Sequence, residues 1–127
     1  MSVRFLAAAA LVVALAAGCG GSARELSVDQ VKSAFARYGL HLQGCVPHVL
    51  EGAIQNPQTC NVYGPGAPAS MTLVEVYDSV KDADTSAHVD RRRLALSAPG
   101  AEVLVARNVL FLSKPWGRAR SAMRSLR

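Results

Sequence analysis

The sequence lacks the motifs of familiar enzymes and the apolar length of a membrane-spanning protein. It contains no Gly-x-Ser-x-Gly elbow, no Cys-x-x-Cys pair, no Asp-x-Asp-x-Asp-Gly calcium loop and no internal repeat. Its longest apolar run, residues 5–17, has 13 residues, whereas a helix needs about 20 to cross a bilayer. With 127 residues the chain is long enough for one domain. These absences exclude the recognisable hydrolases and thiol oxidoreductases, and they leave no catalytic residue that the sequence defines.

The N-terminus has the pattern of an export signal. Arg4 precedes the apolar run, and the string LAAGC then ends at Cys19. LAAGC resembles the lipobox of bacterial lipoproteins, in which a diacylglycerol thioether forms on the cysteine. We therefore expect residues 1–18 to be a signal peptide, Cys19 to carry the lipid and residues 19–26 to form a tether. Because Ala16 stands where the lipobox has a large apolar residue, an ordinary signal peptide and secretion are the alternative.

The cysteine count supports this interpretation. Of the three cysteines, lipidation uses Cys19, and Cys45 and Cys60 remain to pair in an oxidising compartment. Such a disulfide contributes about 3 kcal/mol, and two buried thiols are the alternative. A zinc site made of Cys45, His48, Cys60 and His41 would follow no known zinc spacing, so we expect no metal and no cofactor.

Charge is concentrated at the C-terminus. The net charge is +5, but residues 19–113 carry eight Lys or Arg against nine Asp or Glu. The last 14 residues contain no acidic residue and five basic ones: Lys114, Arg118, Arg120, Arg124 and Arg127. We expect these five to bind an anionic surface, either anionic lipid or a wall polymer, with a solvated C-terminus as the alternative. Nucleic acid is not an expected partner, because we expect the protein to be exported and because Arg91–Arg93 would point in three directions around a helix.

Local patterns predict most of the secondary structure. Ser27 and Gln30 form a capping box that opens a helix over 28–38, and Asp78 or Ser79 caps a second helix that ends before Pro99. Strands are predicted over 71–77 and over 102–113, the latter as two strands with a turn at Arg107–Asn108 or as one bulged strand. Residues 121–127 are expected to form a short closing helix.

The stretch 43–70 has too many Gly and Pro residues for a long regular element. We expect it to be an irregular loop organised by the Cys45–Cys60 disulfide and by a short turn of helix or strand near 46–54, within a single domain over 27–127. The order of elements predicts an α+β fold with two layers, in which helices pack on one face of a mainly antiparallel sheet of about 3–4 strands.

The pieces LAAGCGG, VDQVKSAFARYGL, LVEVYDSVKDAD and ARNVLFL cover about half of the chain. They resemble uncharacterised small lipoproteins and secreted proteins of high-GC Gram-positive (actinobacterial) bacteria. This resemblance supplies no catalytic residue. We expect a lipid-anchored binding module on the extracytoplasmic face of the cell membrane, with an envelope protein of unknown identity as a further partner. The alternatives are an envelope enzyme, which needs a pocket where His, Asp and Ser or Tyr converge, and a purely structural envelope protein.

Overall fold

A computed structural model describes residues 25–48, 57–69 and 72–127. The predicted signal peptide, the lipid site Cys19 and most of the predicted tether lie outside these residues. In the described part of the chain, no helix has both the length and the apolar character needed to cross a membrane.

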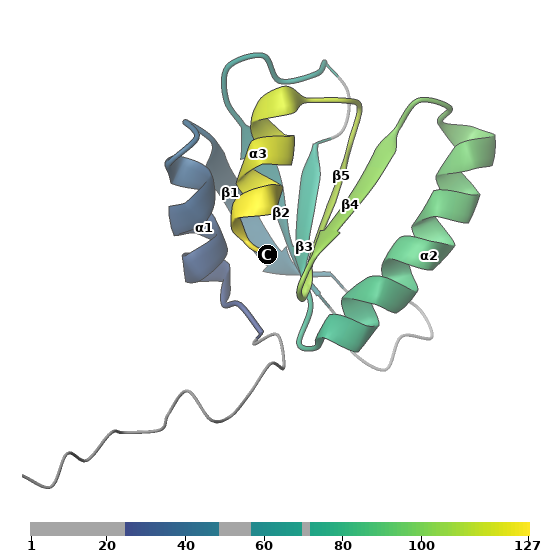
Figure 1. The fold of residues 1–127 in the computed structure, drawn as a ribbon, viewed down its shortest axis with the longest axis horizontal. Coiled ribbons are helices and arrows are strands. Elements are labelled where there is room, and N and C mark those ends of the chain that lie inside the picture. The colour runs from purple at the N-terminus through teal and green to yellow at the C-terminus, as the bar shows by residue number, and fades with distance from the viewer. Residues whose placement is uncertain (1–24, 49–56, 70–71) are drawn as a thin grey trace, which may run out of the picture.

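The described residues form three helices and five strands (Figure 1). In chain order they are α1 (Val28–Ala36), β1 (His41–Pro47), β2 (Gln58–Tyr63), β3 (Leu73–Val76), α2 (Val80–Ser97), β4 (Glu102–Ala106), β5 (Val109–Ser113) and α3 (Gly117–Ser125). The strands form one antiparallel sheet in the order β1-β2-β3-β5-β4. The predicted α+β fold with an antiparallel sheet is confirmed, with five strands in place of the expected 3–4.

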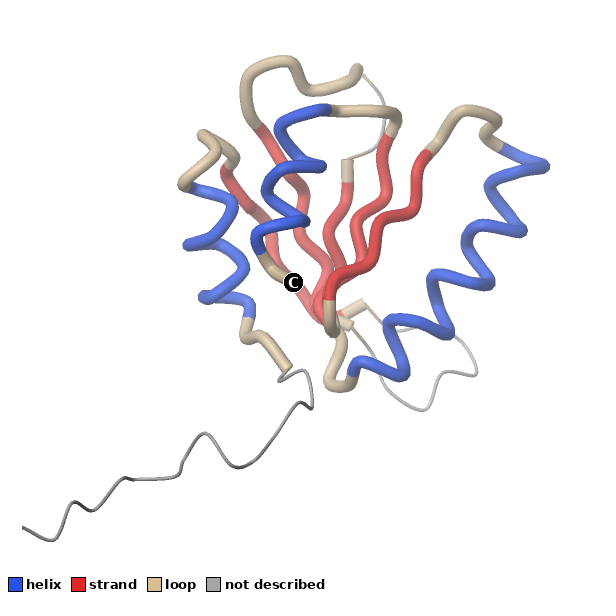
Figure 2. Tube along the Cα trace, in the orientation of Figure 1, coloured by secondary structure: helices blue, strands red, loops and turns tan. Residues whose placement is uncertain are grey.

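The helices cover both faces of this sheet, not one as predicted. Val109 and Phe111 of β5 pack in a core with α1 and α3, whereas Leu110 and Leu112 pack in a second core with α2. Figure 2 shows α2 standing apart from the α1–α3 pair. The reason is that every residue of β5 is buried, so both faces of this central strand need an apolar cover.

The predicted irregular loop over 43–70 contains most of β1 and all of β2. Its Gly and Pro residues flank the strands or bend them: Gly44 has φ +63° at a bulge in β1, and Pro47 ends that strand. Pro57 directly precedes β2. The predicted Cys45–Cys60 disulfide is confirmed and links β1 to β2.

The predicted helix starts are mostly confirmed. The Ser27–Gln30 capping box is present in both directions at α1, and the Ser79 hydroxyl accepts a hydrogen bond from the backbone N–H of Asp82 at α2. Helix α3 begins at Gly117, four residues before the predicted start at 121. The apolar side chain of Trp116 explains the earlier start, since it is buried in the core and fixes the chain at that point.

The β4–β5 turn holds Leu26 against the domain, a role that its sequence does not predict. Arg107, not Asn108, takes the positive φ of 56°. Asn108 is fully buried, and its side chain accepts a hydrogen bond from Leu26 N (2.6 Å) and donates to Leu26 O (2.9 Å) and to Tyr77 O (2.7 Å). Leu26, assigned to the tether from the sequence, is therefore fixed to the folded domain.

Candidate functional site: a cationic groove beside the tether

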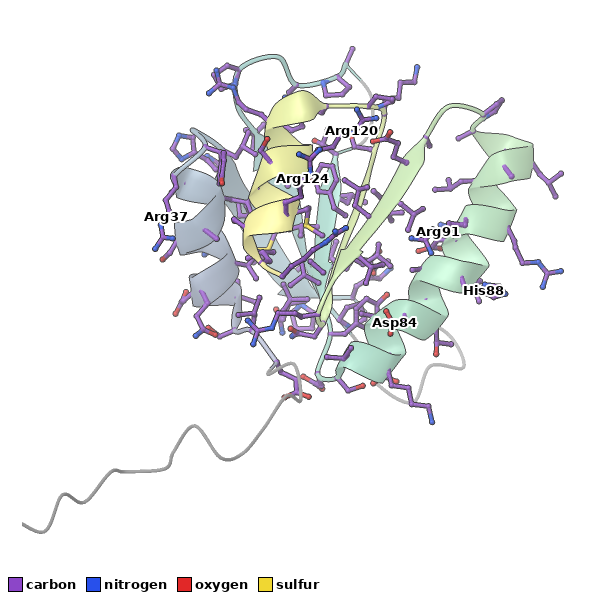
Figure 3. The ribbon with its side chains drawn as sticks, in the orientation of Figure 1. Arg37, Asp84, His88, Arg91, Arg120 and Arg124 are labelled. Carbon is purple, nitrogen blue, oxygen red and sulfur yellow. A yellow bond between two sulfur atoms is a disulfide. The ribbon has the colours of Figure 1, made fainter. Side chains whose placement is uncertain are left out.

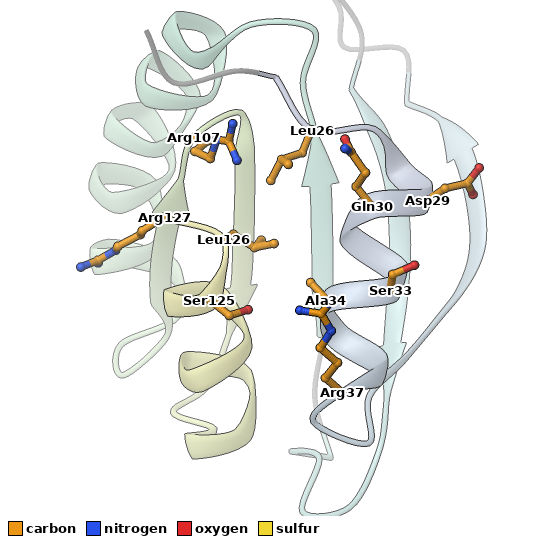
Figure 4. A pocket seen from close by; sticks show the side chains of 10 residues that line it. All are labelled: Leu26, Asp29, Gln30, Ser33, Ala34, Arg37, Arg107, Ser125, Leu126 and Arg127. Atoms are coloured by element: carbon orange, nitrogen blue, oxygen red, sulfur yellow. The ribbon is translucent and has the colours of Figure 1, made fainter. Parts of the chain in front are cut away.

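A groove of about 410 Å³ lies between α1 and α3, next to the point where the tether joins the domain. We call it the cationic groove. It is lined by Leu26, Asp29, Gln30, Ser33, Ala34, Arg37, Arg107, Ser125, Leu126 and Arg127. In Figure 4, Leu26 and Arg107 lie at one end and Arg37 reaches in from α1 near the other, while Arg127 points outward from its rim.

The charge of this groove is predominantly positive. Of the described residues that line it, three are arginines, Arg37, Arg107 and Arg127, and one is acidic, Asp29. The described residues form two ion pairs, Asp90–Arg93 and Glu102–Arg120, and neither of them involves an arginine of the groove. The guanidinium groups therefore retain donors for an anionic ligand, which arginine binds in a planar, two-pronged geometry.

The structure separates the five basic residues that the sequence grouped together. Arg120 forms a two-pronged ion pair with Glu102 of β4, and this pair raises the pKa of the Arg120 guanidinium. Arg118 donates from Nη1 to the Tyr38 carbonyl (3.1 Å), so it joins α3 to the C-terminal end of α1.

The other three basic residues have different surroundings. Arg124 is exposed in the last turn of α3, and Lys114 is exposed just after β5. Arg127 alone among the five lines the cationic groove. Sequence reasoning missed Arg37 and Arg107, which lie 70 residues apart and line the same groove only because α1 and the β4–β5 turn both border it.

Helix α2 carries both acidic and basic side chains, and it lies on the opposite face of the sheet from α1 and α3. Figure 3 shows Asp84, His88 and Arg91 on α2, away from Arg37 and Arg124 on the α1–α3 side. Arg91 donates from Nη2 to the Val103 carbonyl (3.1 Å), and Arg93 pairs with Asp90 (3.1 Å). The arginine run of α2 is thus partly used in internal contacts.

Two carboxylic acids lie between α2 and the sheet. Glu75 is only 7 % exposed, and its Oε2 accepts a hydrogen bond from the Tyr77 hydroxyl (2.9 Å). Burial raises the pKa of Glu75, with a further rise from the charge of Asp90, and burial also raises the pKa values of Asp90 and Tyr77. Asp90 is also largely sheltered, since its side chain is only 15 % exposed. Because Glu75 is buried and already bonded to Tyr77, this cluster favours a structural role over catalysis.

The residues considered for a metal site do not assemble into one. Both sulfur atoms of the sequence-based ligand set are joined in the disulfide, so Cys45 and Cys60 offer no thiolate. His41 and His48 are exposed at the two ends of β1. Across the part of the chain that the structure describes, no three His, Cys, Asp or Glu residues are grouped so that they could hold a metal ion.

Comparisons with protein-family models, with curated proteins and with solved structures find no match to this chain. The site itself therefore carries the functional argument.

Proposed function

We propose that the protein is a lipid-anchored binding module of the bacterial cell envelope, in which the cationic groove holds an anionic group at the membrane surface. The anionic group is a phospholipid headgroup or the phosphate or carboxylate of a wall polymer. Lipid on Cys19 supplies the main anchor, and the groove supplies a second, electrostatic contact that orients the domain. Two such weak attachments together hold a protein more firmly than a single acyl chain does.

The observation that carries this proposal is the position of the groove. Leu26 is at once a lining residue and the last residue before the capping box of α1, so the tether leaves the domain at the groove. The seven Cα–Cα steps from Cys19 to Leu26 span at most about 25 Å when the chain is extended. A lipid on Cys19 would therefore keep Arg37, Arg107 and Arg127 within reach of the headgroups.

The expected strength of this contact follows from the number of basic side chains near the membrane. Each Lys or Arg close to an anionic membrane contributes about 1 kcal/mol of attraction. Arg124, exposed on α3, adds a charge on the same side of the sheet as the groove. Such an interaction is screened by salt, since the Debye length falls from about 10 Å at 0.1 M to about 3 Å at 1 M.

The test separates the lipid from the groove. Wild type and a Cys19→Ser variant are expressed in a bacterial host with labelled palmitate, and label is expected only on the wild type. The exported Cys19→Ser chain is then mixed with vesicles of phosphatidylglycerol and phosphatidylcholine, and its partitioning is measured by sedimentation. We expect binding that depends on phosphatidylglycerol and disappears in 0.5 M salt.

A charge-matched pair of variants assigns the binding to the groove. The triple change Arg37→Ala, Arg107→Ala and Arg127→Ala should weaken partitioning at least tenfold, given about 1 kcal/mol for each charge. The control removes three charges from α2 instead: Lys81→Ala, Arg92→Ala and Arg93→Ala. Equal loss in both variants would mean that net charge alone drives binding, and the groove proposal would be wrong.

A further inference from the structure

A second cavity, of about 340 Å³, lies between α2 and the sheet, near the ends of β4 and β5 that adjoin the C-terminal end of α2. We call it the α2 pocket. Of the described residues that line it, five are apolar: Leu94, Ala98, Pro99, Ala101 and Leu112. The other two are Ser113 and Lys114, so Lys114 is the one charged residue among them. The pocket is therefore an apolar space with a single cation at its edge.

The packing of α2 explains why a space remains there. In Figure 1, α2 leans away from β4 toward its C-terminal end. Its first half is buried through Ala83 and Ala87, whose small side chains allow close approach to the sheet, whereas Leu94 is buried in its second half. Between them, the long side chain of Arg91 reaches across to donate from Nη2 to the Val103 carbonyl (3.1 Å). Beyond Leu94 the helix is no longer held close to the sheet, and the pocket occupies this space.

The far wall of the pocket is a short turn with a fixed backbone. The N–H of Ala98 donates to the Leu94 carbonyl (2.8 Å), and the N–H of Ala101 donates to the Ala98 carbonyl (3.1 Å). Pro99 restricts its own φ, and Gly100 supplies the positive φ of 89° that the turn requires. A wall that is formed before binding loses less conformational entropy when a ligand enters.

The volume of the pocket indicates the size of its ligand. Cavities of about 300–1,000 Å³ are typical of small-molecule sites. One water occupies about 30 Å³ in the liquid, so the pocket has room for about ten groups of that size. A single chain of about eight to ten carbons matches this room. The acyl chain of a membrane phospholipid, which crosses half of a hydrocarbon core about 30 Å thick, is too long to be enclosed.

The charge at the edge of the pocket indicates the head group of the ligand. Leu112 points toward α2, and Lys114 continues the alternation of β5 just past its end. Glu102, which lies opposite Ser113 in the strand register, is held by Arg120. Neither ion pair of the described residues involves Lys114. The ammonium group of Lys114 is therefore available to a carboxylate.

We infer that the α2 pocket binds a free aliphatic carboxylate of about eight to ten carbons. The chain lies against Leu94 and Leu112, and the carboxylate pairs with Lys114. The carbonyl groups in the last turn of α2 carry partial negative charge, so the methyl end of the chain, and not the carboxylate, lies at Ala98. This pocket is separate from the cationic groove, so the inference and the proposed function can each fail without the other.

The experiment titrates the exported Cys19→Ser chain at pH 7 with hexanoate, octanoate, decanoate and dodecanoate. Calorimetry measures the affinity, and backbone amide shifts in ¹⁵N spectra locate the site. We expect octanoate to bind with a dissociation constant of about 0.1–1 mM and to shift residues 94–101 and 112–114. The affinity should rise by up to about fourfold for each added CH₂ and should stop rising beyond about ten carbons.

Two probes of the same chain length test the role of charge. Octanol keeps the apolar chain without the carboxylate, and octylammonium replaces the carboxylate by a cation. We expect octanol to bind about fivefold more weakly than octanoate, and octylammonium at least about tenfold more weakly, because like charges repel at Lys114.

Variants of the pocket separate its charge from its volume. Lys114→Ala should weaken octanoate binding about fivefold and octanol binding by less than about twofold, whereas Lys114→Arg should retain octanoate binding within about twofold. Lys81→Ala removes the same charge from an exposed position of α2 and is the matched control. Ala101→Leu fills the pocket and should weaken both ligands at least about tenfold. Thermal unfolding checks each fold, and Ala98→Leu replaces Ala101→Leu if that variant does not fold.

Four results would overturn the inference. These are no octanoate binding at 10 mM, equal affinity for octanoate and octanol, equal losses in Lys114→Ala and Lys81→Ala, and undiminished binding by the pocket-filling variant. The triple arginine variant of the groove provides the cross-check, since it should bind octanoate like wild type. Ala101→Leu should in turn leave vesicle binding unchanged.

Discussion

The two faces of the sheet differ in how completely they are covered. The face under α1 and α3 holds the larger core, including the aromatic residues Phe35, Phe111 and Trp116, and it carries the cationic groove. The face under α2 holds a smaller core with small helix residues and buries Glu75, and among the described elements α2 packs on β4 and β5. The same strands build both faces because side chains alternate. The difference teaches that one face supplies most of the apolar stabilisation, whereas the other contributes a smaller core under α2 alone.

The largest expected effect tests whether the α1–α3 face supplies more of the apolar stabilisation than the α2 face. The test compares two neighbouring residues of β5. Phe111 lies between Phe35 and Trp116, with ring centroids 6.3 and 6.5 Å away, and it is 1 % exposed. Phe111→Ala should lower the free energy of unfolding by about 3–5 kcal/mol, and Leu112→Ala, on the α2 face, by about 2 kcal/mol. Urea unfolding measures both, with Phe111→Leu as a milder replacement if the alanine variant does not fold. An equal or larger loss for Leu112→Ala would contradict the comparison.

The Cys45–Cys60 disulfide should stabilise β1 and β2, on which α2 does not pack. It joins residues 15 apart, and closing such a loop stabilises a protein by about 3 kcal/mol. Reduction, or the double change Cys45→Ala and Cys60→Ala, should lower the free energy of unfolding by that amount. Hydrogen exchange should accelerate most in β1 and β2. A loss below about 1 kcal/mol, or one spread evenly over the sheet, would show that these two strands do not depend on the crosslink.

Asn108 connects the α1–α3 face to the end of β3. Its substitution tests how much this connection stabilises the domain and the position of Leu26. Asn108→Ala deletes three hydrogen bonds and leaves the backbone groups of Leu26 and Tyr77 unsatisfied, at a cost of about 2–3 kcal/mol. Limited proteolysis should also cut near Leu26 sooner than in wild type. Asn61→Ala is the control, because an exposed amide should change stability by less than about 0.5 kcal/mol. Unchanged proteolysis near Leu26 would mean that Asn108 does not hold the tether junction.

The smallest expected effect concerns the buried acid under α2. Because burial raises the pKa of Glu75 above its ordinary 4.5, the folded protein keeps this proton where the unfolded chain has lost it. Its stabilising contribution is therefore full below pH 4.5 and is lost as the pH rises through the raised pKa. Glu75→Gln keeps an acceptor for Tyr77 and should be more stable than wild type at pH 7, by about 1 kcal/mol.

Thermal unfolding between pH 4 and 8 measures this difference. The stability of Glu75→Gln should fall less steeply than that of wild type over this range, with the remaining slope in part due to Asp90, whose pKa burial also raises. If the two proteins had parallel pH profiles, Glu75 would not be the group that couples the α2 face to pH.

Features encoded by neighbouring residues were predictable. Ser27 and Gln30 define the start of α1, the alternation around Val74 defines β3, and the apolar residues on either side of Arg107–Asn108 define a hairpin. The cysteine count also identified the correct disulfide partners. β2 has no clear signal in the sequence, because Pro57 and Gly64, which bound it, are typical of a loop.

The candidate site was far less predictable. A cluster of basic residues near the C-terminus was visible, yet Glu102 neutralises Arg120 and Tyr38 engages Arg118. Arg37 and Arg107 gave no signal, since each is an isolated charge in its own stretch of sequence. The buried state of Glu75 was equally hidden, because a charged residue in a strand is usually turned to solvent.

The sequence by itself determined the helix caps, the strand alternation, the disulfide partners and the expectation of export with a lipid on Cys19. These depend on residues close together in the chain, or on a simple count. Only the tertiary structure decided which arginines share a groove, which acid is buried and on which strands α2 packs. The physical reason is that strand order and register determine which distant residues meet, and these depend on the whole fold and not on neighbouring residues.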